Sequence, residues 1–254
     1  MSSPVLVAAQ CAVQAGDLAA NLALHLDFMR RAAEQGARLI VFPELSLSGY
    51  EPALASALAQ PADSPLLEPL CAQAMAAGMT AVVGLPLRVA GHDKPQIGAC
   101  ILHPDGSRAI YTKQYLHAGE EQFFSVGQGG ELLLVEGTSV ALSVCADFAH
   151  AEHPAGAAKR GAQVYAASVL IGEGGYPHDS SLLQSHAQRH GLAVLMANHG
   201  GPTGGWAAAG RSALWDEQGR CIASTAAVGN RLLVVSRQPD GWRASDIALF
   251  PGQV

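Results

Sequence analysis

The sequence predicts an α/β protein in which short buried strands alternate with amphipathic helices along the chain. Apolar runs of strand length recur, and stretches with apolar residues at helical spacing follow several of them. The composition agrees with this prediction, because 49% of the residues are hydrophobic and only 14% are charged, as expected for a large buried core. We therefore expect helices packed on sheets in layers.

The chain contains no marker of a domain boundary. It has 254 residues and no long Pro/Ser/Gly linker, charge block, low-complexity tract or repeat. Layered α/β folds reach this length as one unit. We therefore expect a single domain over residues 1–254.

The first elements are a strand, a helix and a second strand. Residues 5–13 form an apolar run that predicts a strand, and Asp17 is suited to cap a helix whose apolar positions recur up to Gly36. Residues 38–42 predict the second strand, which runs directly into Pro43 and Glu44.

The next segment predicts a helix and three strands. Residues 64–77 have a helical pattern that ends at Gly78, and residues 80–85 predict a strand. Residues 98–103 and 108–112 predict a hairpin, because the Asp-Gly pair between them is a strong turn signal.

The second half of the chain repeats the alternation of strands and helices. Residues 140–144 are a bounded apolar run that predicts a buried strand, and Cys145 follows it. Two helices and five further strands are expected: helices at 152–160 and 180–190, strands at 163–168, 192–197, 210–214, 221–224 and 230–236.

Three chemically useful residues stand at the ends of predicted strands, namely Glu44, Lys113 and Cys145. Taken singly, each has an ordinary explanation as a loop carboxylate, a surface lysine or an inert core thiol. Ligands of layered α/β proteins bind beyond the carboxyl ends of strands, where such side chains would meet a substrate. A carboxylate partly shielded from water also has the raised pKa of a general base.

Charge and cysteine usage exclude several classes of partner. The net charge is −6 and the basic residues form no stripe, so neither DNA nor RNA is expected to bind. The N-terminus has no basic region, and its apolar run is shorter than the ~20 residues of a membrane helix. The five cysteines are odd in number and include no CxxC pair, which favours reduced thiols. A cytoplasmic protein without a membrane partner is expected.

Two weak signals do not predict a metal or a cofactor. His186 and His190 are four residues apart on one predicted helix, but no carboxylate completes a metal site. The paired glycines at 129–130 and 204–205 lack the context of a phosphate-binding loop and are better read as turns. No cofactor and no metal are therefore expected.

Taken together, these motifs resemble those of the nitrilase superfamily of carbon–nitrogen hydrolases. The resemblance covers nearly the whole chain and rests on Gly16-Asp17, Asn21, residues 36–50, Tyr111-Thr112-Lys113, Phe124, Gly127, Cys145, Asp147 and residues 197–200. It implies a four-layer αββα sandwich that pairs into a homodimer, or a larger even oligomer, through helices that include the one at 152–160.

The resemblance also implies a role for each residue of the site. Glu44 would be the general base, Lys113 the cationic stabiliser and Cys145 the nucleophile, with Glu120 as a second glutamate and Glu121 as its neighbouring alternative. The thiol would attack an amide carbon and form a thioester, which water then hydrolyses.

Two groups would stabilise the oxyanion that forms during this attack. These are the Lys113 ammonium and the backbone N–H of Ala146. The ammonium would also favour the ionised thiolate of Cys145.

Two positions near Cys145 depart from the family pattern, and they bear on which substrate is expected. Ala146 replaces a common aromatic residue, and Ala149 replaces an arginine suited to grip a carboxylate. Neutral or cationic amides are therefore expected to be better substrates than ω-amides of dicarboxylates, unless Arg189 or Arg211 reaches the site. The candidate substrate contacts are Tyr50, His117, Ala149, His150, Glu173 and Tyr176.

The predicted function is that of a cysteine-dependent amidohydrolase, which cleaves a small amide or ureido compound with water and releases ammonia or an amine. A nitrilase or an amide-forming acyltransferase would use the same three residues. A non-catalytic binding protein of the same fold is the alternative from another class, and it predicts an impaired triad, whereas Glu44, Lys113 and Cys145 are all present.

Overall fold

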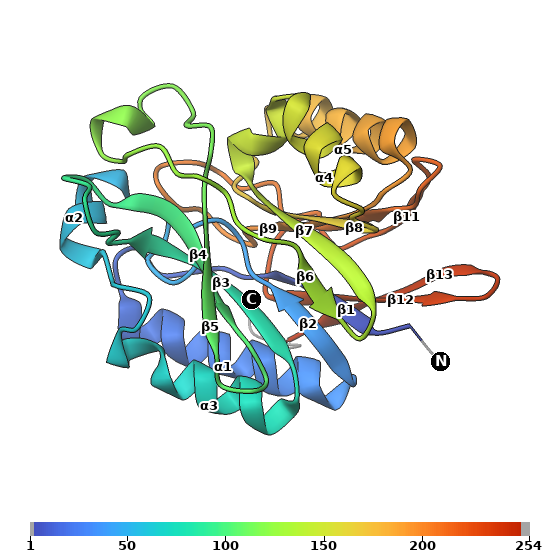
Figure 1. The fold of residues 1–254 in the computed structure, drawn as a ribbon, viewed down its shortest axis with the longest axis horizontal. Coiled ribbons are helices and arrows are strands. Elements are labelled where there is room, and N and C mark those ends of the chain that lie inside the picture. Colours follow the sequence, from blue (N-terminus) through green and yellow to red (C-terminus); the bar gives the residue numbers. More distant parts are fainter. Residues whose placement is uncertain (1–2, 250–254) are drawn as a thin grey trace.

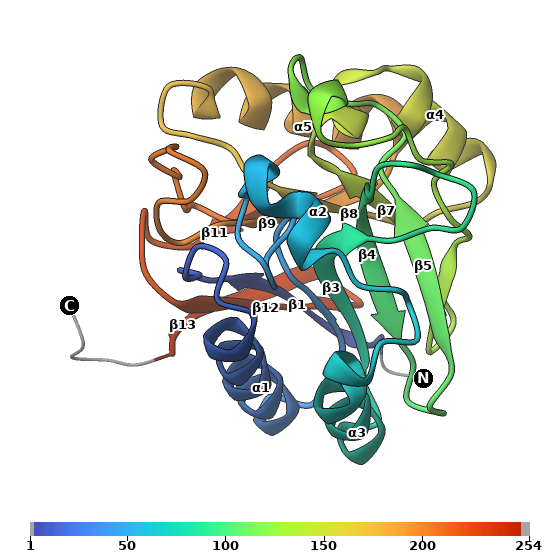
Figure 2. The ribbon, with the colours of Figure 1, turned by 90° about the vertical axis from the view of Figure 1, so that its left-hand side faces the viewer.

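Two β-sheets pack face to face, and helices cover the outer face of each (Figure 1). The computed structural model describes residues 3–249. Helices α1 and α3 lie below the sheets in this view, and α4 and α5 lie above them; a quarter turn shows the same order of layers (Figure 2). The predicted four-layer αββα sandwich is therefore confirmed.

The described residues form one sheet of seven strands and one of six. The first has the order β13 (Gly241–Ala248), β12 (Arg231–Gln238), β1 (Val5–Gln10), β2 (Ala37–Val41), β3 (Thr80–Leu87), β4 (Gln96–Leu102), β5 (Arg108–Thr112). The second has the order β11 (Cys221–Ser224), β10 (Ala213–Trp215), β9 (Ala193–Asn198), β8 (Val164–Val169), β7 (Thr138–Val144), β6 (Leu133–Val135). The helices are α1 (Leu18–Glu34), α2 (Ala55–Leu58), α3 (Glu68–Ala77), α4 (Glu152–Lys159) and α5 (Tyr176–His190).

The layers follow from strands that are apolar on both faces. On β8, Val164 and Ala166 point into the core between the two sheets, while Tyr165 and Ala167 point toward α4 and α5. Successive side chains of a strand face opposite sides, so a continuous apolar run belongs to a sheet covered on both faces.

The predicted C-terminal ends of the helices agree with the structure to within two residues, whereas the helix predicted over residues 180–190 begins earlier, at Tyr176. Asp17 caps α1 by accepting a hydrogen bond from the backbone N–H of Ala20, and Gly78 ends α3 in the left-handed conformation. The helix predicted over residues 64–77 is interrupted, because Pro65–Leu67 forms a 3₁₀ turn before α3 begins.

Several elements differ from the predictions. The first strand ends at Gln10, and α2, β6 and β13 were not predicted. β13 is an edge strand with several exposed or half-buried residues, so it lacks the apolar run that marks a buried strand. α2 and β6 are four and three residues long, too short for a periodic pattern.

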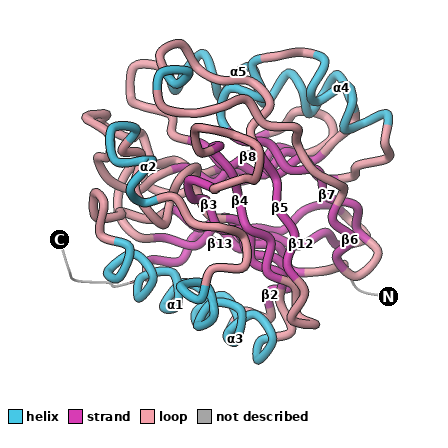
Figure 3. Tube along the Cα trace, turned by 60° about the vertical axis from the view of Figure 1, so that its left-hand side comes forward, coloured by secondary structure: helices cyan, strands magenta, loops and turns pink. Residues whose placement is uncertain are grey.

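Strand direction brings several chain segments to one end of the sandwich. β1, β2 and β3 are parallel, and β5 has the same direction because β4 is antiparallel to both β3 and β5. In the second sheet, β7, β8 and β9 are parallel. The carboxyl ends of parallel neighbours meet at one edge, and the tube in Figure 3 shows loops gathered around these strands.

Within residues 3–249, every helix is too short or too polar to span a bilayer.

Candidate active site

Glu44 lies in the loop that follows β2, with only 1% of its surface exposed. His199 donates a hydrogen bond from Nε2 to the Glu44 carbonyl oxygen at 2.7 Å. On the other side, the loop contacts Gly84 of β3, where an added Cβ would lie 2.4 Å from the carbonyl oxygen of Pro43. The Glu44 backbone is therefore held from two directions.

Lys113 follows β5 directly and is fully buried. Its backbone N–H donates to the carbonyl of Ile97 at 2.8 Å, which extends the β4–β5 ladder by one residue. Its ammonium donates to Glu44 Oε1 at 2.7 Å and to both carboxylate oxygens of Glu120 at 2.8 Å. One buried cation thus holds two buried carboxylates.

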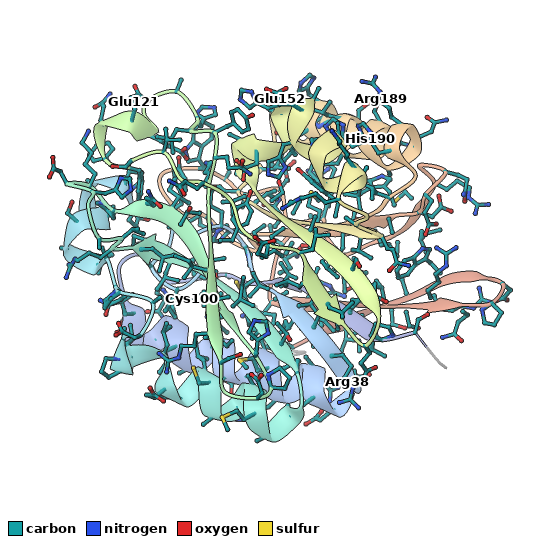
Figure 4. The ribbon with its side chains drawn as sticks, viewed as in Figure 1. Arg38, Cys100, Glu121, Glu152, Arg189 and His190 are labelled. Carbon is teal, nitrogen blue, oxygen red and sulfur yellow. The ribbon has the colours of Figure 1, made fainter. Side chains whose placement is uncertain are left out.

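Glu120 opens the 3₁₀ turn Glu120–Gln122 and is buried. Besides Lys113, it accepts hydrogen bonds from the Tyr50 hydroxyl and from the His117 backbone N–H, each at 2.7 Å. Glu121 is exposed, accepts from the Gly119 N–H and lies on the outer loop in Figure 4. Of the two adjacent glutamates, only Glu120 contacts Lys113.

Cys145 is half-buried where β7 ends, and it begins the 3₁₀ helix Cys145–Ala149. Its φ is 43°, in the left-handed region that residues with a side chain rarely adopt. Strained backbone of this kind clusters at functional sites. The thiol lies 3.8 Å from the carbonyl oxygen of Leu170, which belongs to the segment after β8.

Asp147 joins the turn after Cys145 to the turn after Lys113. Its buried carboxylate accepts from the backbone N–H groups of Val144 at 2.9 Å, Gln114 at 2.9 Å and Tyr115 at 3.0 Å. The hydroxyl of Tyr111 donates a fourth hydrogen bond at 2.6 Å. A single side chain thus fixes the exits of β5 and β7 relative to each other.

Burial and charge set the protonation of the Glu44–Lys113 pair. Burial raises the pKa of Glu44 to about 7, although the Lys113 ammonium opposes this shift. Burial lowers the pKa of Lys113, but the carboxylates of Glu44 and Glu120 outweigh that effect and raise it above its ordinary value. Lys113 is therefore a cation near neutral pH, while Glu44 can gain and release a proton there.

Lys113 acts on Cys145 with the expected sign, because the ammonium lowers the pKa of the thiol, but this effect does not decide the resting state. Burial and the negative charge of Glu44 raise the pKa of the thiol well above its ordinary value, and the opposing effect of Lys113 is smaller. The ammonium has two carboxylates beside it, so little of its charge remains to stabilise a thiolate. The resting site is a neutral thiol beside a carboxylate.

A cavity of about 480 Å³ opens over Cys145 and Glu44. Of the predicted substrate contacts, Tyr50, His117 and Glu173 line it, whereas Ala149, His150 and Tyr176 do not. Ala149 is exposed, His150 stacks on Tyr115 at 3.8 Å between ring centroids, and the Tyr176 hydroxyl donates to the carbonyl of Arg211. Ala149 and His150 lie at the end of the 3₁₀ helix that begins at Cys145, and Tyr176 is the first residue of α5.

The rest of the cavity wall includes residues that sequence reasoning missed. They are Leu170, Ile171, Gly172, Gly174, Gly175, Asp179, Trp206 and Ala207. The glycine-rich segment 172–175 comes two residues after the end of β8, the strand that pairs with β7. The rule that strand ends border the ligand crevice would have pointed to it.

The described part of the chain offers no evident metal site. Within residues 3–249, no group of three or more His, Cys, Asp or Glu side chains is arranged to hold a metal ion. His186 is instead engaged through Nε2 with the carbonyl oxygen of Phe148 at 2.7 Å.

The αββα layers, together with buried Glu44 and Lys113 and a half-buried Cys145, agree with the pattern of the nitrilase superfamily. The chain belongs to the carbon–nitrogen hydrolase family, whose sequence model matches residues 6–246. The predicted family is therefore confirmed.

Solved structures of an amidase from Nesterenkonia sp. AN1 are similar over nearly the whole chain. A variant whose cysteine is replaced by alanine, in complex with butyramide, is 29% identical with a TM-score of 0.84, and the match covers 92% of this chain and 91% of that one. A second variant, with the same identity and TM-score, covers 92% and 90% and shows covalent addition of the acetamide moiety of fluoroacetamide at its active-site cysteine.

Curated relatives match a smaller part of the chain. A hydrolase of Mycobacterium tuberculosis, found in strains CDC 1551 / Oshkosh and ATCC 25618 / H37Rv, is 30% identical over 164 residues. The match covers 62% of this chain and 58% of the relative. This chain therefore spans less than two thirds of the length of these relatives.

Proposed function

We propose that the protein is a cysteine-dependent amidohydrolase that cleaves the C–N bond of a small amide or ureido compound through a thioester. One observation carries the proposal: the buried Lys113 ammonium contacts Glu44 and Glu120, and these two carboxylates line the same cavity as Cys145. Membership of the carbon–nitrogen hydrolase family and similarity to an amidase support it.

Glu44 acts as the general base in the first step. Its Oε1 accepts from Lys113, while Oε2 is buried and has no hydrogen-bond partner within residues 3–249. That free oxygen can accept the proton of the Cys145 thiol as sulfur attacks the amide carbon. A base whose pKa is about 7 suits this transfer near neutral pH.

The charge that develops on the amide oxygen is stabilised by fixed donors. Lys113 supplies a cation that its two carboxylates hold in place, and the backbone N–H of Ala146 is the second donor. Glu120 is a positioning residue, because it holds Lys113 and is itself held by Tyr50 and His117.

The thioester is then hydrolysed. The tetrahedral intermediate collapses with cleavage of the C–N bond, and the leaving nitrogen takes the proton that Glu44 received. Glu44, again a carboxylate, removes a proton from a water molecule, whose oxygen attacks the thioester carbon. The C–S bond breaks, and Cys145 regains its proton as the acid leaves.

The test combines turnover with covalent trapping. Ammonia release should be measured over a panel of amides, ureides and nitriles, and fluoroacetamide should add one acetamide moiety to Cys145 with loss of fluoride. Cys145→Ala should abolish both results, whereas Cys221→Ala, which removes an exposed thiol, should preserve them. Turnover by Cys145→Ala would contradict the proposal, and a nitrile preferred over every amide would favour the nitrilase alternative.

We also propose that residues 1–254 act as one catalytic domain, assembled as a homodimer or larger even oligomer in the cytoplasm. Helix α4 supports the assembly, because its small alanine side chains would let another helix approach closely on the outer layer. The five free cysteines suit a reducing compartment. Sedimentation that finds only monomer at micromolar concentration would contradict the assembly, and cell fractionation tests the location.

A further inference from the structure

We infer that the amidohydrolase site selects amides whose acyl chain carries a positive charge, and that Asp179 is the residue that recognises this charge. The inference rests on the proposed function and extends it to a substrate class. Three observations support it: the reacting groups are buried at the inner end of the cavity, the cavity wall carries acidic side chains, and Asp179 lies on that wall.

The cavity is closed at its reactive end. Glu44 and Lys113 are buried there, so the amide group must sit at this inner end to reach Cys145. A primary amide has only a small NH₂ group on one side of its carbon. The acyl chain therefore extends toward the outer wall, formed by residues 172–175 together with Asp179 and Trp206.

The charged side chains that line the cavity are all acidic. Lys113, behind the wall, offsets only one of the two carboxylate charges of Glu44 and Glu120, so the inner end is not positive. On the outer wall, the charge of Glu173 is cancelled by Arg211. Asp179 has no such partner within residues 3–249, and it gives the outer wall a negative potential.

Asp179 is half-buried in the first turn of α5 and lines the cavity. Within residues 3–249, no side chain pairs its carboxylate in an ion pair or donates a hydrogen bond to it. Its Oδ2 lies against Gly175, where an added Cβ would be 3.2 Å away, so the carboxylate is close to the glycine-rich wall. Burial raises the pKa of Asp179, and the neighbouring His178 and His117 oppose that shift only in part.

Trp206 offers a second feature suited to a cation. It lines the same wall, its ring contacts Gly172, and 53% of the residue is exposed. The face of an indole ring attracts ammonium groups. Thr203 and Gly204, just before Trp206, are tied to Tyr50 and Glu51, so the tryptophan is attached to the loop that also carries Glu44.

The available arginines are not placed to bind an anionic substrate. Arg211 is held by the Glu173 carboxylate and lies over the Tyr176 ring, 4.2 Å from its centroid. Arg189 lies on the outer surface of α5 in Figure 4 and is exposed. An acyl chain that ends in a carboxylate would therefore meet Asp179 without a compensating cation.

The experiment compares kcat/KM for ω-amino primary amides with three to five methylene groups and for their isosteres at pH 8. Each ammonium is replaced by methyl in the neutral isostere and by carboxylate in the anionic one. We expect the best ω-amino amide to exceed its neutral isostere ~10-fold or more, and the anionic one to be poorest. The advantage should shrink as salt is added, because salt screens charges near the surface.

Asp179→Asn should lower the ratio of kcat/KM between the ω-amino amide and its neutral isostere ~10-fold. Asp63→Asn removes an exposed carboxylate outside the cavity and should leave that ratio unchanged. Hydrolysis of neutral amides without a preference for the ω-amino series would overturn this inference alone. Ammonia release from none of the amides would overturn the proposed function and this inference with it.

Discussion

The Lys113 ammonium lies 2.7 Å from Glu44 Oε1, and both side chains are shut away from solvent. Glu120 completes the coordination of the same ammonium from the opposite side. Removing one partner of a buried ion pair exposes the other to the full cost of an unpaired charge. The three residues are therefore expected to respond to substitution as a unit rather than independently.

The pH dependence of turnover tests the role of Glu44. Its pKa is raised to about 7, and only the carboxylate form can accept the thiol proton, so kcat/KM should fall as the pH decreases through about 7. Glu44→Gln should lower kcat by ~10²-fold or more, while Glu131→Gln, at an exposed position, should match the wild type. An acid limb near the ordinary pKa of glutamate would contradict the assignment.

The adjacent glutamates form a matched pair of variants. Glu120→Gln removes a charge from the buried Lys113 site and should reduce kcat by ~10²-fold, because a displaced catalytic group loses productive geometry. Glu121→Gln changes an exposed residue and should have no effect. Steady-state kinetics and circular dichroism separate lost activity from lost structure. The reverse pattern would assign the positioning role to Glu121.

Asp147→Asn tests whether this side chain joins the turn after Lys113 to the turn after Cys145. The carboxylate accepts three backbone hydrogen bonds and one from Tyr111, and an amide nitrogen in its place would face donors instead of accepting from them. The free energy of unfolding, measured in urea, should fall by about 1–3 kcal/mol, and kcat should also decrease. Asp63→Asn is the exposed control, and equal stability of the two variants would contradict this role.

Gly84→Ala should displace the loop that carries Glu44. The new Cβ would lie 2.4 Å from the carbonyl oxygen of Pro43 and 2.6 Å from the nitrogen of Leu45, so the loop that carries Glu44 must shift. We expect a loss of about 1–3 kcal/mol in the free energy of unfolding and a lower kcat. Gly156→Ala, in α4 with no atom within 4 Å, should be neutral or stabilising. Wild-type kcat in Gly84→Ala would show that the loop tolerates the shift.

Local sequence patterns predicted much of the fold but not all of it. The hairpin strand at residues 108–112 and the caps at Asp17 and Gly78 agree with the structure, because turn chemistry and capping act over a few neighbouring residues. The edge strand β13 escaped prediction, since pairing with β12 and not its own pattern makes it a strand.

By itself, the sequence determined which chemical groups this protein presents and that each follows a strand. An apolar run ended by a polar residue specifies both facts locally, and this holds for Glu44, Lys113 and Cys145. Only the tertiary structure decided that the ends of β2 and β5 in one sheet meet the end of β7 in the other. It also decided that burial outweighs Lys113 at the thiol and that Asp179 and Trp206 complete the cavity wall. The physical reason is that desolvation and cavity shape depend on every layer packed around a residue, whereas strand and turn propensities depend on its neighbours in the chain.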